Sequence, residues 1–135
     1  MTRRDGLDLS ATILEAARAV HAGLPPGLGA VAYREALGIE LTRRRVPISA
    51  GVEVPIHYKG IRLTAHYRVD FVCGGALLVL VRTAGGGGGE LSWVPGCLEA
   101  SGAIRAVVLG VGGQSLQWAQ VVRSARPRLV AEALT

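Results

Sequence analysis

The residue best suited to chemistry is Asp70, a carboxylate near the end of the predicted strand YRVDFV at residues 67–72. A carboxylate in apolar surroundings needs a cation, because a buried charge without a partner is strongly destabilising. A second predicted strand, residues 76–81, follows the tight turn Gly74-Gly75, and Arg82 stands at its end. We therefore expect Asp70 and Arg82 to form an ion pair across adjacent strands.

The histidines and serines form no recognisable catalytic or metal-binding pattern. The spacings of His21, His57 and His66 fit no familiar metal site, so we expect these side chains to be structural or solvent-facing. His57 and His66 flank a hairpin, which predicts that they are cross-strand neighbours on one face. No serine lies in a Ser-His-Asp context. We expect no cofactor and no bound metal.

The two cysteines, Cys73 and Cys97, have neither CxxC nor Cys/His spacing. We interpret them as buried free thiols in a reducing compartment. The N-terminal residues lead into an amphipathic helix without the apolar run of a signal peptide. No apolar segment is long enough to span a membrane. We therefore expect a cytoplasmic protein that makes no membrane contact.

Composition predicts one folded domain over residues 1–135. Half of the residues are apolar and only 4 % are aromatic, which indicates a substantial core built from aliphatic side chains. We expect a polar arm at residues 1–7, a Gly-rich loop at 84–90 and a tail at 127–135. The five glycines at 85–89 lack the following Lys and Ser/Thr of a phosphate-binding loop, so we interpret them as a flexible linker.

The formal net charge of +5 is carried almost entirely by arginine, since Lys59 is the only lysine. We interpret this charge chiefly as a solvated surface, and phosphate contacts are the alternative. Arg43, Arg44 and Arg45 stand at the end of a predicted helix, where cations suit the helix dipole.

Hydrophobic periodicity predicts two helices, then strands. Helical spacing covers residues 8–23, and the Pro25-Pro26 pair separates it from a second helix over residues 28–44. We expect Val31, Ala36, Leu37 and Leu41 to form the inner face of that helix.

Alternating apolar residues then predict a half-exposed strand around residues 52–56, in which Pro55 indicates an edge or a bulge. The sequence YKGI at 58–61 predicts a hairpin turn, and residues 62–72 form the return strand. A helix over 91–101, interrupted near its start by Pro95-Gly96, precedes a buried strand over 103–111 and a last strand around 118–123. The continuous apolar run at 107–109 favours a parallel partner covered on both faces. The fold class is therefore α/β, with order αα-βββ-α-β-β.

Several short strings in this order resemble the bacterial GxxExxY family of the PD-(D/E)XK nuclease superfamily. They are LPPGL at 24–28, YREAL at 33–37, HYKG at 57–60, YRVDFV at 67–72 and the segment at 100–109. The resemblance implies a nuclease-like core, a central mixed sheet with an antiparallel meander and one parallel strand, flanked by helices.

The resemblance also implies a catalytic pattern, from which this chain departs. In that superfamily an Asp and a Glu bind Mg²⁺, a Lys two residues beyond the Glu assists the attacking water, and an early-helix Glu completes the site. Here the Asp is Asp70, but Leu80 stands at the Glu position and Arg82 at the Lys position. Ala30 replaces the helix Glu, and a further Gln position falls near Trp93.

These departures lead us to expect a catalytically inactive nuclease fold, not an enzyme, that acts as an interaction, scaffold or self-assembling module. The partner would be a protein or a second copy, with a homo-oligomer expected. One alternative is a module that binds nucleic acid without cleaving it, through Arg43, Arg44, Arg45, Arg68 and Arg82. A second alternative is a Mg²⁺-dependent nuclease with a rearranged site.

Overall fold

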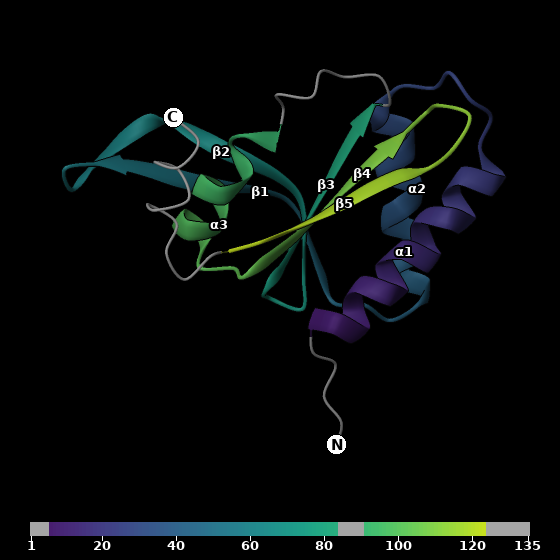
Figure 1. Cartoon of the computed structure of the whole chain (residues 1–135), viewed down its shortest axis with the longest axis horizontal. Coiled ribbons are helices and arrows are strands. Elements are labelled where there is room, and N and C mark those ends of the chain that lie inside the picture. Colours follow the sequence, from purple (N-terminus) through teal and green to yellow (C-terminus); the bar gives the residue numbers. More distant parts are fainter. Residues whose placement is uncertain (1–5, 84–90, 124–135) are drawn as a thin grey trace.

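A computed structural model describes residues 6–83 and 91–123 (Figure 1). Eight elements follow one another within these described residues. The helices are α1 (Gly6–Gly23), α2 (Ala30–Arg43) and α3 (Val94–Ser101). The strands are β1 (Ile48–Tyr58), β2 (Ile61–Cys73), β3 (Leu77–Thr83), β4 (Arg105–Val111) and β5 (Gln117–Val122). The predicted order αα-βββ-α-β-β is confirmed.

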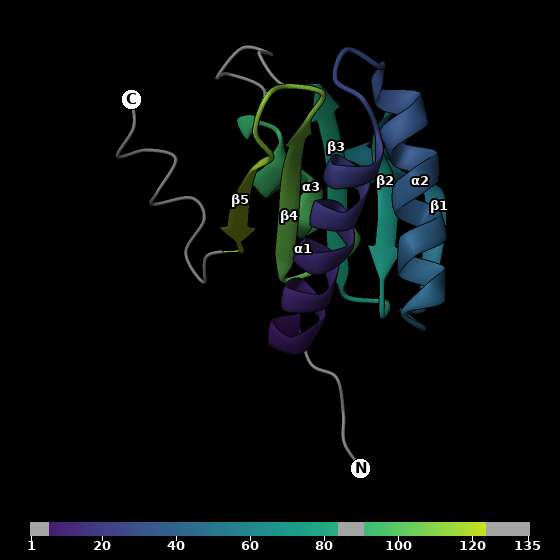
Figure 2. The same ribbon diagram turned by 90° about the vertical axis from the view of Figure 1, so that its right-hand side faces the viewer.

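The strands form one mixed sheet in the order β1-β2-β3-β4-β5. The β1-β2 and β2-β3 pairs are antiparallel, β3-β4 is parallel, and β4-β5 is antiparallel. Helices α1 and α2 cover one face of the sheet and α3 covers the other (Figure 2). The α/β fold class, the antiparallel meander and the parallel partner of the apolar strand are therefore all confirmed.

Strand β3 is the centre of the hydrophobic core. Its residues from Leu77 to Val81 are all buried, and their side chains alternate between the two faces. Leu77, Val79 and Val81 pack on the side of α1 and α2, while Leu78 and Leu80 pack on the side of α3. This burial on both faces explains why the strand reads as a continuous apolar run.

The inner face of α2 differs from the prediction. Val31 is 61 % exposed, whereas Tyr33, Leu37 and Leu41 are buried at successive four-residue spacings. The Tyr33 hydroxyl donates a hydrogen bond of 2.7 Å to the carbonyl of Pro25 in the loop before the helix. This aromatic side chain therefore sets the rotation of the helix about its axis, and Val31 faces outward.

Two other local predictions also need correction. The helix predicted over 91–101 begins only at Val94, because Pro95 fits the first turn, where no backbone N–H is needed. His57 and His66 are not cross-strand partners. His57 pairs with Arg62 and His66 pairs with Pro55, because the β1-β2 register shifts between Pro55 and His57. The predicted irregularity at Pro55, on edge strand β1, is confirmed.

The β1-β2 hairpin extends well past the rest of the sheet (Figure 1). Strand β2 pairs with β3 only over residues 71–73, so its outer part pairs with β1 alone. We call residues 52–69 the arm and residues 57–66, every one of which is exposed, the arm tip. The tip closes in a two-residue turn at Lys59-Gly60, with φ of 51° and 81°.

Within residues 6–83 and 91–123, no helix is both long enough and apolar enough to cross a membrane. The predicted location in the cytoplasm stays a prediction. The Gly-rich loop and the tail fall outside the residues that the structure describes.

The hydrogen bond of Tyr33 provides a first test of the packing. Replacing Tyr33 by Phe keeps the ring but leaves the Pro25 carbonyl without this donor, so we expect a loss of about 1 kcal/mol in the free energy of unfolding. Urea denaturation measures this loss. The control is Tyr58→Phe at a ring that is 61 % exposed, which should leave the stability unchanged. Equal losses of stability from the two substitutions would contradict a stabilising hydrogen bond between Tyr33 and Pro25.

The thiols provide a second test. Cys73 and Cys97 are free and buried, as predicted. Burial raises the thiol pKa from the ordinary value of 9.0 to about 12 for Cys73 and to about 11 for Cys97. We expect a thiol reagent such as DTNB to react slowly with the native protein at pH 8 and to react with both thiols after unfolding in urea. Fast reaction of the native protein would show that these side chains are accessible.

The same shifts predict a pH dependence of stability. Because the folded-state pKa values are raised, the folded chain holds its thiol protons at pH values where the unfolded chain has lost them. This stabilising contribution is complete below pH 9.0 and decreases as the pH rises toward about 11 and 12. The Cys73→Ala/Cys97→Ala double variant should therefore lose less stability over that interval, as measured by urea denaturation.

Candidate functional site

Asp70 lies where β2 and β3 separate. The paired register of these strands ends at Phe71 and Val79. One residue further along β2, the Asp70 Oδ2 atom accepts a hydrogen bond of 2.7 Å from the backbone N–H of Val81. The carboxylate thus takes the place of a main-chain acceptor in the gap between the strands. This local geometry fixes the side chain at the branching point of the sheet.

The second Asp70 oxygen binds an arginine of helix α2. Arg34 Nε donates to Asp70 Oδ1 at 2.7 Å, and the two side chains are 36 % and 13 % exposed respectively. A hydrogen bond between charged groups in such a partly buried setting is stronger than a neutral one. The predicted ion pair with Arg82 is therefore wrong, because Arg34 supplies the cation from the opposite helix layer.

Arg82 instead lies over an aromatic ring. Its Cζ atom is 4.9 Å from the ring centroid of Trp93, and that ring stacks on Tyr67 at 5.9 Å with an interplanar angle of 19°. The buried Nε of Arg82 has no hydrogen-bond partner among the described residues. Because Val81 packs toward α1 and α2, the next side chain along β3 points toward α3, away from the Arg34 side.

The remaining predicted site positions are spread over the fold. Ala30 is the first residue of α2, Leu80 is 1 % exposed in the core on the α3 side, and Trp93 directly precedes α3. Arg34 follows Ala30 by four residues, which places both on one face of the helix. That spacing is the one signal by which the sequence could have indicated Arg34.

The predicted basic residues do not form one patch. Arg43 and Arg44 lie at the far end of α2, about 20 Å along the helix axis from its start. Arg44 forms an ion pair with Glu40 one turn earlier. Arg45 follows with φ of 63°, and Arg68 lies on β2 opposite Glu53. Of these five arginines, Arg68 lies on the same strand as Asp70, and Arg82 lies near the end of the neighbouring strand β3.

The described residues do not fit a magnesium ion. Mg²⁺ requires oxygen ligands and is usually held by one or two carboxylates together with substrate phosphates. In the described part of the chain no three His, Cys, Asp or Glu side chains gather into a candidate metal site. Both oxygens of Asp70 already accept hydrogen bonds, from Arg34 and from Val81. We therefore assign no chemical step to a metal at these residues.

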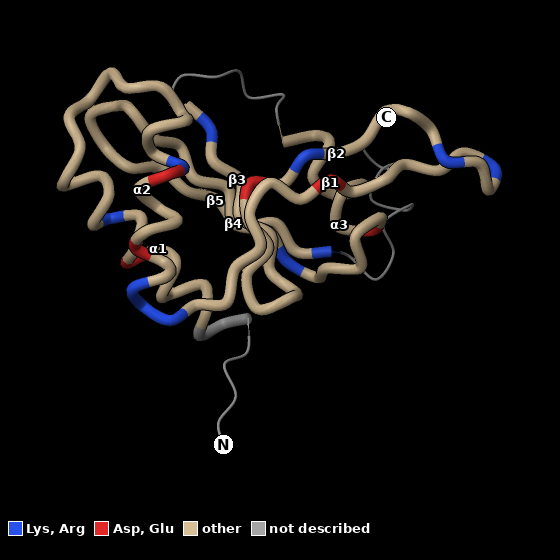
Figure 3. The backbone as a smooth tube through the Cα atoms, turned by 180° about the vertical axis from the view of Figure 1, so that it is seen from behind, with Lys and Arg blue, Asp and Glu red and all other residues tan. Residues whose placement is uncertain are grey.

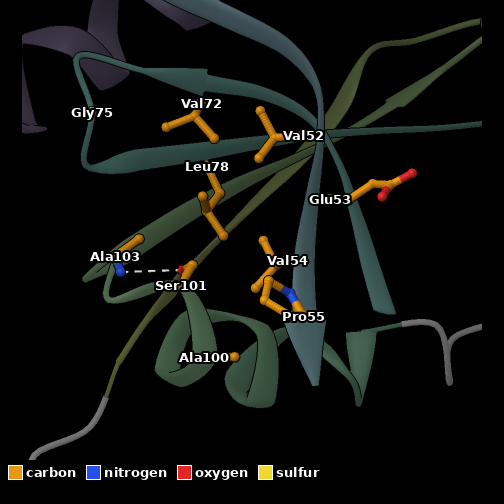
Figure 4. Close-up of a pocket in the computed structure, with 10 residues that line it drawn as sticks. All are labelled: Val52, Glu53, Val54, Pro55, Val72, Gly75, Leu78, Ala100, Ser101 and Ala103. Atoms are coloured by element: carbon orange, nitrogen blue, oxygen red, sulfur yellow. Dashed lines mark hydrogen bonds between the residues drawn. The ribbon is translucent and has the colours of Figure 1, made fainter. Parts of the chain in front are cut away.

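Among the hollows beside the sheet, two border strand β1. One, of about 330 Å³, lies between the base of the arm and the end of α3 (Figure 4). The Glu53 side chain points away from it. The Ser101 hydroxyl donates a hydrogen bond to the Leu98 carbonyl and accepts one from the Ala103 N–H. The polar side chains that line this hollow therefore do not converge on it, and it does not resemble a catalytic site.

The other hollow, of about 760 Å³, lies between α2 and β1. Its lining includes the apolar side chains of Ile39, Ile48 and Phe71 together with Arg34, the cation bound to Asp70. The ion pair at the branching point of the sheet is therefore adjacent to an open, mainly apolar groove.

Comparison with known proteins gives the family. The sequence model of the PD-(D/E)XK nuclease superfamily matches residues 7–85, which is more than half of the chain. The chain belongs to this superfamily. The match runs from α1 to the end of β3 and so includes Arg34, Asp70 and Arg82.

A solved structure agrees with this fold. The crystal structure of SSO0001 is similar with a TM-score of 0.51 and 10 % identity, over 96 % of this chain and 84 % of that one. The alkaline exonuclease LHK-Exo from Laribacter hongkongensis aligns with a TM-score of 0.49 and 8 % identity, over 97 % of this chain and 76 % of that one. At such identities the likeness to SSO0001 shows the fold alone, and from the second alignment we draw no conclusion. Among curated proteins, none matches the chain.

The family match corrects one prediction. From the departures at Ala30, Leu80 and Arg82 we expected the chain not to be an enzyme, but the superfamily to which it belongs is one of nucleases. The prediction treated the loss of individual site residues as the loss of the activity. Residue types at aligned positions do not by themselves exclude a nuclease.

The packing of α3 against the arm yields a further test. A Cβ atom added at Gly96 would lie 2.6 Å from the Tyr67 hydroxyl oxygen. We expect Gly96→Ala to destabilise the protein by about 1–2 kcal/mol, because the added methyl displaces the ring stacked on Trp93. In a Tyr67→Phe background the clash disappears, so Gly96→Ala should be neutral or stabilising there, since Ala favours helices. Urea denaturation of the wild type, the two single variants and the double variant measures these effects. The same loss of stability from Gly96→Ala in both backgrounds would contradict the contact between Gly96 and the Tyr67 hydroxyl.

Proposed function

We propose that this protein acts on nucleic acid and that a backbone phosphate binds at Arg82, beside the strands that carry Asp70. The observation that carries the proposal is the state of the Arg82 guanidinium. It is stacked on Trp93, its buried Nε lacks a hydrogen-bond partner, and no carboxylate among the described residues forms an ion pair with it. Membership in a nuclease superfamily supports phosphodiesters as the substrate class.

The charges around Asp70 support an anionic ligand. Arg34 binds the carboxylate of Asp70, so that carboxylate no longer opposes the approach of a phosphate with a full negative charge. Arg82 adds a further positive charge from the other face of the same strand pair. A guanidinium that is held over an aromatic ring by such a cation–π contact is also pre-organised for the paired hydrogen bonds that phosphate oxygens accept.

We further propose that the chain belongs to the GxxExxY family within its superfamily. The support is the set of strings that resemble that family, notably YREAL at 33–37 and HYKG at 57–60. The first string contains Arg34, and the second forms the turn of the arm tip. Self-association and docking to a protein partner stay predictions.

Binding of a fluorescein-labelled DNA duplex, measured by anisotropy over a range of salt concentrations, tests the proposed function. We expect Arg82→Ala to weaken binding about tenfold and to lower the salt slope by about one, because one phosphate contact is lost. Arg82→Lys should retain the salt slope but bind more weakly than the wild type, since lysine keeps the charge and loses the planar stack.

The matched control is Arg44→Ala, which removes the same charge from an arginine already paired with Glu40. It should leave the affinity for the duplex close to that of the wild type. The absence of wild-type binding at low salt, or equal effects of the Arg44 and Arg82 substitutions, would refute the proposed site. Incubation of the bound duplex with Mg²⁺ tests hydrolysis separately. DNA fragments that the wild type produces and the Asp70→Asn variant does not would assign cleavage to this site.

A further inference from the structure

The arm is a two-stranded ribbon that carries positive charge into solvent. Its residues 52–69 contain Lys59, Arg62 and Arg68 against one acid, Glu53, which gives a net charge of +2 with histidines neutral. Glu53 itself lies 3.5 Å from the Nε2 atom of His66. The arm tip, residues 57–66, contains no acidic residue at all. In Figure 3 the outer end of the arm accordingly shows Lys and Arg without Asp or Glu.

The exposed apolar side chains of the tip indicate that this ribbon contacts a partner. Tyr58 and Ile61 are 61 % and 68 % exposed, although they are directly opposite each other in the register. A two-stranded ribbon without further cover is marginally stable in water. The turn residue Lys59 moreover adopts φ of 51°, a conformation that glycine or asparagine occupies more readily. The only lysine of the chain is thus held at the outermost point of the arm.

We infer that the arm tip inserts into the major groove of a nucleic-acid duplex whose backbone is bound at Arg82, on the strand next to Asp70. This inference rests on the proposed function and adds to it the form of the substrate. An antiparallel ribbon with strands about 4.8 Å apart fits a major groove that is about 12 Å wide, whereas the minor groove of about 6 Å excludes it. Lys59 and Arg62 supply the charge that the phosphates of both groove walls require.

The distance between the tip and the site agrees with this arrangement. Strand β2 connects them without interruption, from Arg62 in the tip to Asp70 at the branching point. Eight residues of strand span about 26 Å, which is less than one helical turn of a duplex at about 34 Å. A duplex whose backbone lies at Arg82, on the strand next to Asp70, therefore presents a groove within reach of the tip.

Charge distinguishes this occupant from a second copy of the chain. Edge pairing of two arms with their tips side by side would bring Lys59 and Arg62 close to their own copies, and like charges directly opposite each other are destabilising. Tyr58, whose ring lies 5.4 Å from the Lys59 ammonium, is amphipathic and suits a wet, charged groove. The positive, acid-free tip is complementary to phosphates.

The test compares duplex binding by an arm variant and by the site variant. Lys59→Glu/Arg62→Glu reverses two exposed charges, and we expect it to weaken binding of a 20-base-pair duplex by more than about tenfold and to lower the salt slope by about two. The matched control, Lys59→Arg/Arg62→Lys, keeps both charges and should bind with nearly the wild-type affinity. Methyl green, which occupies the major groove, should compete with the protein, and netropsin, which occupies the minor groove, should not.

The outcomes separate this inference from the proposed function. Wild-type affinity of the Lys59→Glu/Arg62→Glu variant, together with weakened binding by Arg82→Ala, would overturn the inference and leave the proposed function intact. No duplex binding by the wild type would overturn both. Light scattering on a sizing column adds a third result: a dimer that dissociates in the arm variant without any change in duplex affinity would assign the arm to a second copy and overturn the inference.

Discussion

The hydrogen bond from the Val81 N–H to the Asp70 carboxylate determines how the sheet divides. Up to Phe71, strand β2 is an ordinary neighbour of β3. At Asp70 a side-chain oxygen takes over the backbone donor of β3, so β2 is released from pairing without leaving that N–H unsatisfied. Beyond this point β2 pairs only with β1 and continues into the arm. The candidate site and the arm are therefore two consequences of one local arrangement.

The charge on Asp70 connects this branching point to the helix layer. The partly buried carboxylate needs a cation, and helix α2 provides it through Arg34. That helix is in turn held by Tyr33, Leu37 and Leu41 against the core, with the Tyr33 hydroxyl fixed to the preceding loop. Packing thus places the guanidinium of Arg34. Arg82, on the other face of the sheet, has no carboxylate partner among residues 6–83 and 91–123.

Membership in the nuclease superfamily and the residues at the site give complementary information. Membership in the family gives the fold and supports the substrate class that we propose. In the proposed site the phosphate binds at Arg82, which lies over Trp93, while Arg34 neutralises Asp70. Membership in the family, rather than any single aligned residue, corrects the expectation that the chain is not an enzyme.

Local patterns predicted much of the backbone. The apolar run of β3 and its parallel neighbour, the turn at Gly74-Gly75 with φ of 62° and 77°, and the irregularity at Pro55 were all predictable, because each depends on residues close in sequence. The exposure of Val31 and the pairing of His57 were not, since a single buried tyrosine and a shift in register decide them.

The sequence by itself therefore determined the order of the elements, the identity of the central strand and the presence of one carboxylate that requires a cation. Only the tertiary structure decided which cation binds it. Arg34 and Asp70 are 36 residues apart, and no local spacing connects them. Arg82 is nearer in sequence, but strand alternation turns its side chain to the face covered by α3, where Trp93 receives it. Which arginine binds Asp70 depends on the face of the sheet on which each guanidinium lies, and these faces exist only once the chain has folded.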